Sequence, residues 1–307
     1  KYKCPLQTQG TKTGERVVLT LAGGTEKKFK TYADLGMRSK VADEWSDVMA
    51  ESTGLIVFSA MPEGGLTTLT DVSLQETDRL MRDFISIEEK SAPELEMENI
   101  EQVFYDASAG ESPGTLMPKL IRKYPDVYVV RDMVDADSGK ALMDQAGEGK
   151  LIITSTPARD AADALVRVCQ HAPRKQVAET AIGSISGRLI RKLCTECRIG
   201  FEPSPDLLKK LGIPAGKVEQ LYREPKEEEI DKPCKACGGI GYRGRTAMYE
   251  VLLPDDTVRE TLIKKPKSDV VRKAARVGGM RTFQEEGILL VAKGATSLSE
   301  LQRVLKT

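Results

Sequence analysis

The sequence predicts an α/β fold with a mainly parallel sheet, followed by a tetracysteine zinc module and a C-terminal helical subdomain. Short apolar runs alternate with helical segments up to residue 170, a pattern typical of parallel sheets covered by helices. Two Cys-x-x-C pairs follow, with 36 residues between them. A length of 307 residues, 40% of them hydrophobic, is enough for two or three globular domains.

Four apolar runs are expected to form the strands of the sheet. The run at 54–59 has the composition of a parallel strand that is buried on both faces. The other three lie at 84–87, 127–130 and 151–154, and an earlier strand is expected at 16–21, before a basic linker. The helices expected in this part lie at 34–49, 67–82, 113–123, 137–147 and 160–170.

The remainder of the chain divides into an irregular segment and a helical end. Residues 191–248 are expected to be irregular, with a charged loop at 224–229. Four helices are expected after residue 255, at 258–263, 269–277, 282–292 and 297–305.

Two cysteine pairs carry the metal prediction. Four thiolates form the usual ligand set of a tetrahedral zinc site, whereas two redox dithiols or a chance pattern are the alternatives. We favour zinc, held by Cys194, Cys197, Cys234 and Cys237. The other cysteines, Cys4 and Cys169, have no evident partner in the sequence. Unpaired cysteines beside a zinc-type array indicate a reducing cytosol.

The charge balance limits the classes of partner. Lys+Arg and Asp+Glu both number 46, which argues against a nucleic-acid-binding surface over the whole chain and leaves only a local patch open. No apolar run approaches ~18 residues, so no transmembrane helix is predicted. The first residues show no signal-peptide pattern and are similar to mid-domain sequence, so we expect a piece of a longer protein.

A dense set of residues in the second half carries a family resemblance. Residues 187–303 resemble the C-terminal region of the ATPases that drive type II secretion and type IV pilus assembly. The matching segments are 187–194, both cysteine pairs, 241–246, 249–252, 274–275, 279–282 and 286–287. Residues 14–18 look like the end of the family's N-terminal module, and 34–37 like its linker to the motor core.

The resemblance implies an architecture and a setting. Residues 1–30 would be the end of the N-terminal module and linker, 31–190 a RecA-like core, 191–248 the metal module, and 249–307 the helical subdomain. It also implies a homo- or hetero-hexameric ring in the cytoplasm, peripheral to the inner membrane and in contact with an inner-membrane platform protein. Direct membrane insertion and a nucleic-acid partner are not expected.

The phosphate-binding loop of the family is altered here. Such a loop needs glycines that let backbone N–H groups approach phosphate, a Lys for the β/γ oxygens, and a hydroxyl for Mg²⁺. The resemblance places Leu66 at the Lys position and Glu63 at a Gly position. The candidate nucleotide-binding residues that remain are Gly64, Gly65, Leu66, Thr67 and Thr68, with Asp126 on a later strand. Binding of ATP and Mg²⁺ is therefore in doubt.

The other three motifs are altered too. Glu88 keeps a carboxylate of the family's acidic box and either positions water or Mg²⁺ or is a solvated strand end, two interpretations that we weigh equally. Asp132 takes the place of the catalytic Glu and is one methylene shorter, and proton transfer or water positioning depends on ~1 Å placement. Arg131 replaces the preceding Gly. The family's histidine box follows a strand, and Pro157 takes the place of its His here. Lys150 takes the place of the family's other His in this segment, just before the strand.

Three functions follow from this pattern. The favoured one is an ATPase-like subunit with weak or lost hydrolysis and a structural or regulatory role in the assembly ring. The alternative is a divergent ATPase that powers pilus assembly or protein secretion, completed in trans by cations of a neighbouring subunit such as Lys1, Lys3 and Arg16. The third is a zinc module that binds a partner or nucleic acid. His171, the only histidine, lies outside the motifs.

Overall fold

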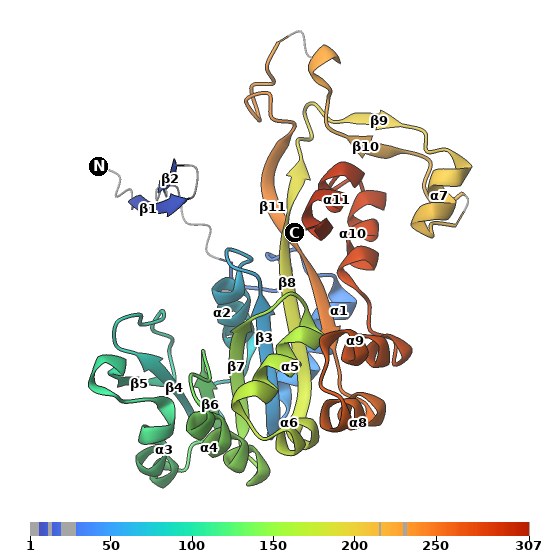
Figure 1. The fold of residues 1–307 in the computed structure, drawn as a ribbon. Helices are drawn as coiled ribbons and strands as arrows, with labels where there is room; N and C mark the ends of the chain where they lie inside the picture. The colour runs from blue at the N-terminus through green and yellow to red at the C-terminus, as the bar shows by residue number, and fades with distance from the viewer. Residues whose placement is uncertain (1–5, 12–13, 20–28, 215, 230–231, 307) are drawn as a thin grey trace.

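A seven-stranded sheet forms the centre of the molecule. The computed structural model describes residues 6–11, 14–19, 29–214, 216–229 and 232–306 (Figure 1). The strand order is β11-β8-β3-β7-β6-β4-β5, and β11 alone runs antiparallel, against β8. The strands are β3 (Gly54–Ala60), β4 (Phe84–Glu89), β5 (Ile100–Tyr105), β6 (Val127–Val130), β7 (Leu151–Pro157), β8 (Ala181–Leu193) and β11 (Tyr242–Leu252).

The four strands predicted for the sheet are confirmed as β3, β4, β6 and β7. The strand predicted at 16–21 corresponds to β2 (Gly14–Leu19), which pairs with β1 (Leu6–Thr11), and its expected end lies outside the described residues. Three strands of the sheet were not predicted. β5 is an edge strand with a partly exposed face. β8 contains small residues because α1 packs close to it, and a Cβ on Gly183 would lie 2.7 Å from the Val48 side chain.

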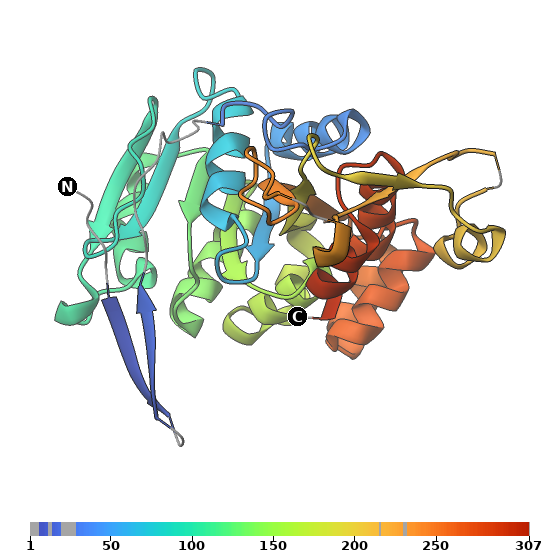
Figure 2. The ribbon, with the colours of Figure 1, turned by 90° about the horizontal axis from the view of Figure 1, so that it is seen from above.

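Helices cover both faces of the sheet, as Figure 2 shows from above. α1 (Ser39–Ala50) and α2 (Leu66–Glu76) cover one face. The other face carries α3 (Pro113–Leu120), α4 (Ala136–Gly147), α5 (Ala161–His171), α6 (Arg174–Thr180), α8 (Asp256–Lys264) and α9 (Ser268–Val277). The helix predicted at 34–49 starts later, because Gly36 has a φ of 78°, and the helix predicted through residue 82 ends before Thr77, which is extended.

Aspartate side chains begin several of these helices. Asp135, Asp160 and Asp255 accept hydrogen bonds from backbone N–H groups in the first turns of α4, α5 and α8. A side-chain oxygen at this position satisfies a donor that the helix itself leaves free. These caps explain why the predicted starts at 137, 160 and 258 lie within two residues of the observed ones.

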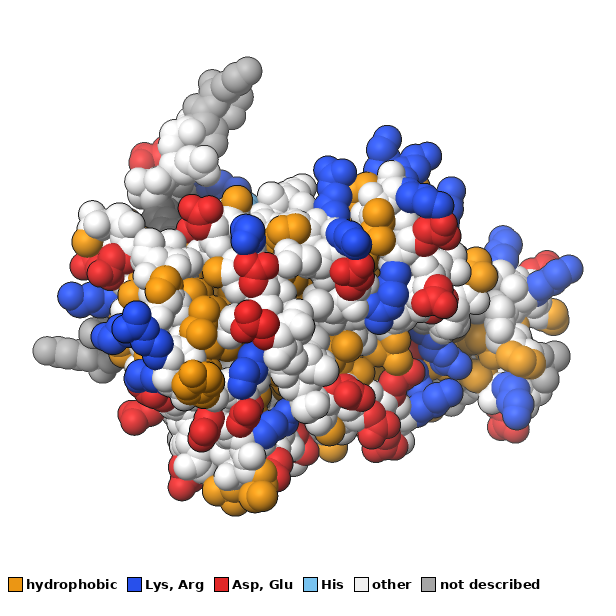
Figure 3. Space-filling view, turned by 90° about the horizontal axis from the view of Figure 1, so that it is seen from below, with side chains coloured by type: hydrophobic (Ala, Val, Ile, Leu, Met, Phe, Trp, Pro, Cys, Tyr) orange, Lys and Arg blue, Asp and Glu red, His pale blue; other side chains and the backbone are white. Residues whose placement is uncertain are grey.

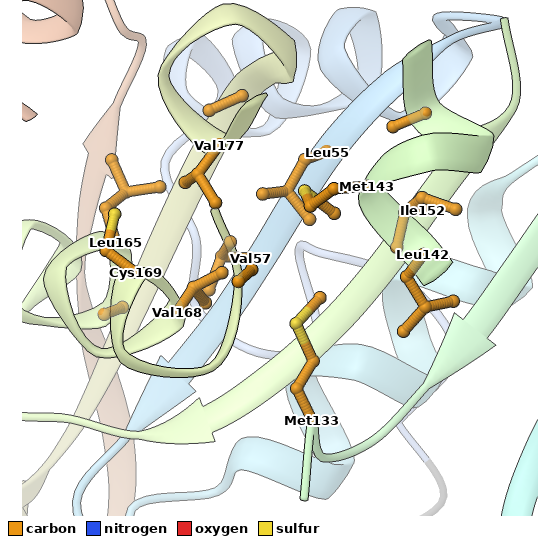
Figure 4. Close-up of a cluster of buried hydrophobic side chains, with 14 of the residues drawn as sticks. Leu55, Val57, Met133, Leu142, Met143, Ile152, Leu165, Val168, Cys169 and Val177 are labelled. Atoms are coloured by element: carbon orange, nitrogen blue, oxygen red, sulfur yellow. The ribbon is translucent and has the colours of Figure 1, made fainter. Parts of the chain in front are cut away.

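The core between the sheet and the second helical layer is apolar and closely packed (Figure 4). Leu55 and Val57 of β3 point into it, while Ile56 and Phe58 point to the opposite layer. All four have no exposed surface. A strand buried on both faces explains the continuous apolar run from which β3 was predicted.

The strands β8 and β11 continue beyond the sheet and carry the cysteine segment at their ends (Figure 1). The helices α10 (Phe283–Ala292) and α11 (Leu298–Lys306) pack on them through Ile190, Met248 and Leu301. The segment 191–248 is therefore more regular than predicted, since it also contains β9 (Ile199–Phe201), α7 (Pro205–Leu211) and β10 (Leu221–Arg223). The limits expected at 190 and 248 each fall inside a strand.

The surface mixes both signs of charge. Figure 3 shows acidic and basic side chains interspersed over the face seen from below, as the formal net charge of zero leads one to expect. Among the described residues no helix combines the length and apolarity that crossing a bilayer requires.

One buried carboxylate makes stability depend on pH. Burial raises the pKa of Glu250 from 4.5 to about 7, although the Phe283 N–H donates to its Oε1 at 2.8 Å. A raised pKa means that the folded state holds its proton longer, so this stabilisation is present below pH 4.5 and is lost as the pH rises through about 7. We expect Glu250→Gln to stabilise the protein at pH 8 by on the order of 3 kcal/mol, and much less at pH 5.

Urea unfolding of both proteins at the two pH values measures this difference. The control is Glu300→Gln: burial opposes the shift, but Arg303 and Arg191 hold the pKa of Glu300 at about 2, so its loss should destabilise at both values. An equal effect of Glu250→Gln at pH 5 and pH 8 would contradict the assignment.

Candidate functional site

The loop between β3 and α2 keeps the backbone shape of a phosphate-binding loop. The Gly64 N–H donates to the Met61 carbonyl at 2.8 Å, and a Cβ on Gly64 would lie 2.6 Å from that oxygen. Gly65 precedes α2 with a φ of 88°. Glu63 also lies in the left-handed region, with a φ of 61°, although it is not glycine. The loop therefore holds a conformation that favours glycine even where glycine has been replaced.

The lysine position of this loop faces inward. Leu66 is partly buried against the apolar cluster that α1 and α2 form with the sheet. Thr67 is exposed, and Thr68 lines the cavity described next. The first residue of α2 thus contributes to the core and supplies no cation to the loop.

A cavity of about 850 Å³ lies beside the loop, between α2 and the extended strands β8 and β11. Gly64, Gly65 and Thr68 line one side of it. The other side carries three basic residues, Lys192, Arg243 and Arg245, which the structure leaves exposed and which have no ion pair among the described residues. No sequence signal distinguishes these three cations, since they belong to segments that resemble the family as a whole.

The carboxyl end of β6 carries an ion pair at the position where the family has a Gly. Arg131 follows the strand directly, and its Nη2 lies 2.7 Å from Oδ1 of Asp71 on α2. Its Nε lies 3.8 Å from Oε1 of Glu94, in the loop after β4. The side chains of Arg131 and Asp71 are only 16% and 10% exposed. A partly desolvated pair of this kind interacts more strongly than a surface pair.

Glu88 is fully engaged by protein donors. It is 4% exposed, and its Oε1 accepts a hydrogen bond from the Ser86 hydroxyl at 2.5 Å. Its Oε2 accepts from the Glu94 N–H at 2.9 Å, and the Gln102 amide lies 3.2–3.3 Å from both oxygens. Of the two interpretations of Glu88, the solvated strand end does not fit this burial. The Glu88 carboxylate instead connects β4, through hydrogen bonds, to the loop that contains Glu94 and to Gln102 of β5.

Asp126 lies at the opposite edge of the sheet from the loop. It precedes β6, where Val127 pairs with Leu151, which in turn pairs with Gly54 at the start of β3. The loop follows the other end of β3, roughly 20 Å away at about 3.3 Å per residue. Asp126 instead accepts a hydrogen bond from the Asp83 N–H at 3.0 Å. The structure does not bring Asp126 to the predicted nucleotide site.

Of the remaining motif residues, Lys150 precedes β7 at the same edge as Asp126, and its Nζ lies 3.9 Å from Oδ1 of Asp126. The others lie at the carboxyl edge. Asp132 is exposed; desolvation by its surroundings raises the pKa of its carboxyl, and nearby His171 opposes this. Pro157 ends β7 opposite Ala60. Asp160, three residues further on, caps α5 and pairs with Arg272 of α9. No described contact joins Asp132 to residues 60–68.

The four cysteines converge at the end of the extended strands. Their sulfur atoms all lie within 4.8 Å of one another, with Sγ–Sγ distances of 3.9 Å for Cys194–Cys234 and 3.6 Å for Cys197–Cys237. Tetrahedral zinc with Zn–S bonds of about 2.3 Å requires sulfur atoms about 3.8 Å apart. The Gly241 N–H also donates to Cys237 Sγ at 3.3 Å, a contact that favours a thiolate.

The thiol chemistry fits a cation as well. Burial and the hydrogen-bonded neighbouring thiols raise the pKa of Cys197, whereas at Cys237 burial is outweighed by hydrogen bonds from the Gly241 N–H and from Cys197, which lower the pKa of Cys237 to about 7. One thiolate is thus favoured at the expense of its neighbours, and four thiolates together require a positive ion. Gly238 and Gly239 follow the second cysteine pair with φ values of 66° and 86°. Glycine adopts these angles without steric strain, so the chain can turn tightly around the sulfur atoms. This donor set could hold zinc.

Comparison with known proteins gives matches of one kind over nearly the whole chain. A family model described as type II/IV secretion system protein matches residues 2–303. The type IV pilus assembly ATPase PilB of Thermus thermophilus is 26% identical over 299 residues, which are 96% of this chain and 32% of that protein. The type II secretion system protein HxcR of Pseudomonas aeruginosa is 24% identical over 302 residues, 98% of this chain and 59% of that protein.

Two solved structures share the fold. The Legionella pneumophila ATPase DotB superposes with a TM-score of 0.64 at 14% identity, over 99% of this chain and 73% of DotB. The pilus retraction motor PilT with bound ADP gives a TM-score of 0.60 at 16% identity, over 98% of this chain and 77% of PilT. These similarities confirm the RecA-like α/β core that the sequence predicted. The chain spans about a third and about 60% of the two curated relatives above.

The strained loop residue gives a first test. A non-glycine residue in the left-handed region costs roughly 1–2 kcal/mol, so we expect Glu63→Gly to raise the free energy of unfolding by about 1 kcal/mol after the extra backbone entropy of glycine. Asn99, with a φ of 62°, is a matched control, because asparagine tolerates this region better and Asn99→Gly should gain less. Urea unfolding compares the variants; equal gains would count against strain at Glu63.

The cysteine cluster gives a second test. We expect Cys194→Ser to abolish bound zinc, measured by elemental analysis, and to expose the segment between residues 195 and 240 to proteolysis. The paired part of β8 and β11 should stay resistant, because α10 and α11 cover it. Cys169→Ser, at a buried thiol outside the cluster, should retain the metal. Retention of zinc by both variants would show that the four sulfur atoms are not the ligands.

Proposed function

The chain belongs to the type II/IV secretion system protein family, and on this premise we propose that it is an assembly-ring subunit with weak or lost ATP hydrolysis. It would form a homo- or hetero-hexamer with ATPase-type subunits and act there as a structural or regulatory member. Its setting would be the cytoplasmic side of the inner membrane, beside the platform protein of a pilus or secretion machine. The named relatives PilB and HxcR belong to such systems, which supports this setting.

The observation that carries the proposal is the inward position of Leu66. In phosphate-binding loops this residue is a Lys that reaches the β/γ oxygens. Here the side chain packs against the core, and the loop beside it carries the negative charge of Glu63. Glu63 is exposed, so solvent and salt screen its repulsion of a phosphate, but its charge acts in the same direction as the loss of the lysine. The loop has therefore exchanged attraction for repulsion toward a phosphate.

The catalytic positions support the same proposal. Glu88 has no carboxylate oxygen without a protein donor, so it has little capacity to order a water molecule. Asp132 is short for the role, and Pro157 cannot donate a hydrogen bond. The core does not depend on any of these groups for its packing, which is why a ring subunit could keep the fold after losing the chemistry.

A second candidate remains a divergent ATPase, and one observation favours it. Lys192, Arg243 and Arg245 face the loop across the cavity and could supply positive charge to a bound nucleotide from the same chain. Arg16 on β2, expected to act in trans, is exposed. Lys1 and Lys3 lie outside the described residues. Exposed cations are screened by salt, so they compensate a missing loop lysine only in part.

Calorimetric titration with Mg-ATP and with a non-hydrolysable analogue tests the proposal. We expect no detectable binding to the zinc-loaded chain up to millimolar nucleotide, because Leu66 and Glu63 remove the main phosphate contacts. Zinc content and a cooperative unfolding transition serve as controls for folding. Binding at micromolar affinity would contradict the proposal and favour the divergent ATPase, and repeating the titration over a range of protein concentrations would show whether neighbouring subunits complete the site.

A further inference from the structure

Arg131 joins the two elements that usually hold a catalytic magnesium ion. In ATPases with a phosphate-binding loop, Mg²⁺ is bound by the loop hydroxyl at the start of the helix and by a carboxylate at the end of a neighbouring strand. Here α2 begins just before Thr67, and β6 ends just before Arg131. Asp71 lies four residues after Thr67, which is about one helical turn on the same side of α2. The Arg131–Asp71 pair therefore lies within about one turn of the loop hydroxyl.

The guanidinium of Arg131 forms ion pairs with acidic residues of the same chain. Asp71 and Glu94 contact the guanidinium from two different segments. Glu88 accepts a hydrogen bond from the backbone N–H of Glu94. Burial raises the pKa of Glu94, which Arg131 lowers and Asp71 and Glu88 raise further. Two carboxyl groups thus contact one guanidinium, and a third, that of Glu88, lies on the far side of Glu94. A phosphate that entered this region would meet more negative than positive charge.

Two guanidinium nitrogens of Arg131 lack a hydrogen-bond acceptor among the described residues. Its Nε and Nη1 are buried and make no hydrogen bond to the described residues. A buried guanidinium normally satisfies most of its five N–H donors. Arg131 is therefore held by its charge-assisted hydrogen bond to Asp71 and by the nearby charge of Glu94.

We propose that Arg131 is a built-in substitute for the bound metal ion: its pair with Asp71 holds α2 to the end of β6 without nucleotide and excludes Mg-nucleotide from the site. This inference rests on the proposed function and deepens it, because it names the residue that maintains the unliganded state. The role of Arg131 predicts an effect that is separate from the effects of Glu63 and Leu66 in the loop. Restoring the loop alone does not restore the site.

Loop repair with and without Arg131 tests the proposal. The double variant Glu63→Gly/Leu66→Lys restores the glycine and the lysine, and the triple variant adds Arg131→Gly, the residue that the family pattern has there. Mg-ATP binding is measured by calorimetry and by the shift of the unfolding temperature. We expect the triple variant to bind at least tenfold more tightly than the double variant, and Arg131→Gly alone to unfold at a lower temperature without response to Mg-ATP.

The controls separate the possible failures. Arg131→Lys in the loop-repaired background keeps the charge and should bind as weakly as the double variant, and Arg131→Gln replaces the glycine variant if that does not fold. Equal affinity of the double and triple variants, including no binding by either, would overturn the role of Arg131. Micromolar binding by the unmodified chain would instead overturn the proposed function, so the two results are distinguishable.

Discussion

The antiparallel pairing of β8 with β11 is the constraint on which the rest of the structure depends. β8 is 13 residues long, and its first half pairs with β3 inside the sheet while its second half runs out with β11 to the cysteines. The pairing continues to the cluster itself, since the Cys194 N–H donates to the Gly241 carbonyl at 2.9 Å. The Leu193 N–H donates to the Ala295 carbonyl at 2.9 Å, which ties in the turn before α11. One strand pair therefore couples the core, the cysteine cluster and the C-terminal helices.

This dependence explains why the fold tolerates changes at the loop. The sheet is stabilised by apolar burial on both faces, and the site at its carboxyl edge contributes little to that burial. Two of the replacements instead add contacts to the fold. Leu66 packs against the cluster of α1 and α2, and Arg131 pairs with Asp71. Such contacts stabilise the unliganded state, so substitutions that alter a functional motif also contribute to the packing of the fold, a common relation at active sites.

The sequence predicted those parts of the molecule whose signal is local. β3 is a continuous apolar run, the C-terminal helices have clear periodicity, and the cysteine pairs have fixed spacing; all three are found. β8 was missed because glycines and serines interrupt its apolar pattern. Gly183 lies against α1 and the Ser184 hydroxyl donates to the Ala161 carbonyl, contacts that only the tertiary structure contains. Asp126 was misplaced for a related reason. The motif places Asp126 directly before a strand. Because β6 runs parallel to β7 and β3, the residue before β6 lies at the edge where β3 begins, opposite the loop.

The same limit applies to the candidate site, where the deciding quantity is the position of each positive charge. From the sequence, replacement of the loop lysine by Leu66 is a loss of one cation, and Arg131 is an extra one nearby. In the structure the charge of Arg131 is neutralised, because Asp71 and Glu94 form ion pairs with it. The cations that remain free lie across the cavity on Lys192, Arg243 and Arg245, where solvent screens them. A phosphate would thus be attracted to the mouth of the cavity and repelled at the loop, which is the reverse of the arrangement that hydrolysis requires.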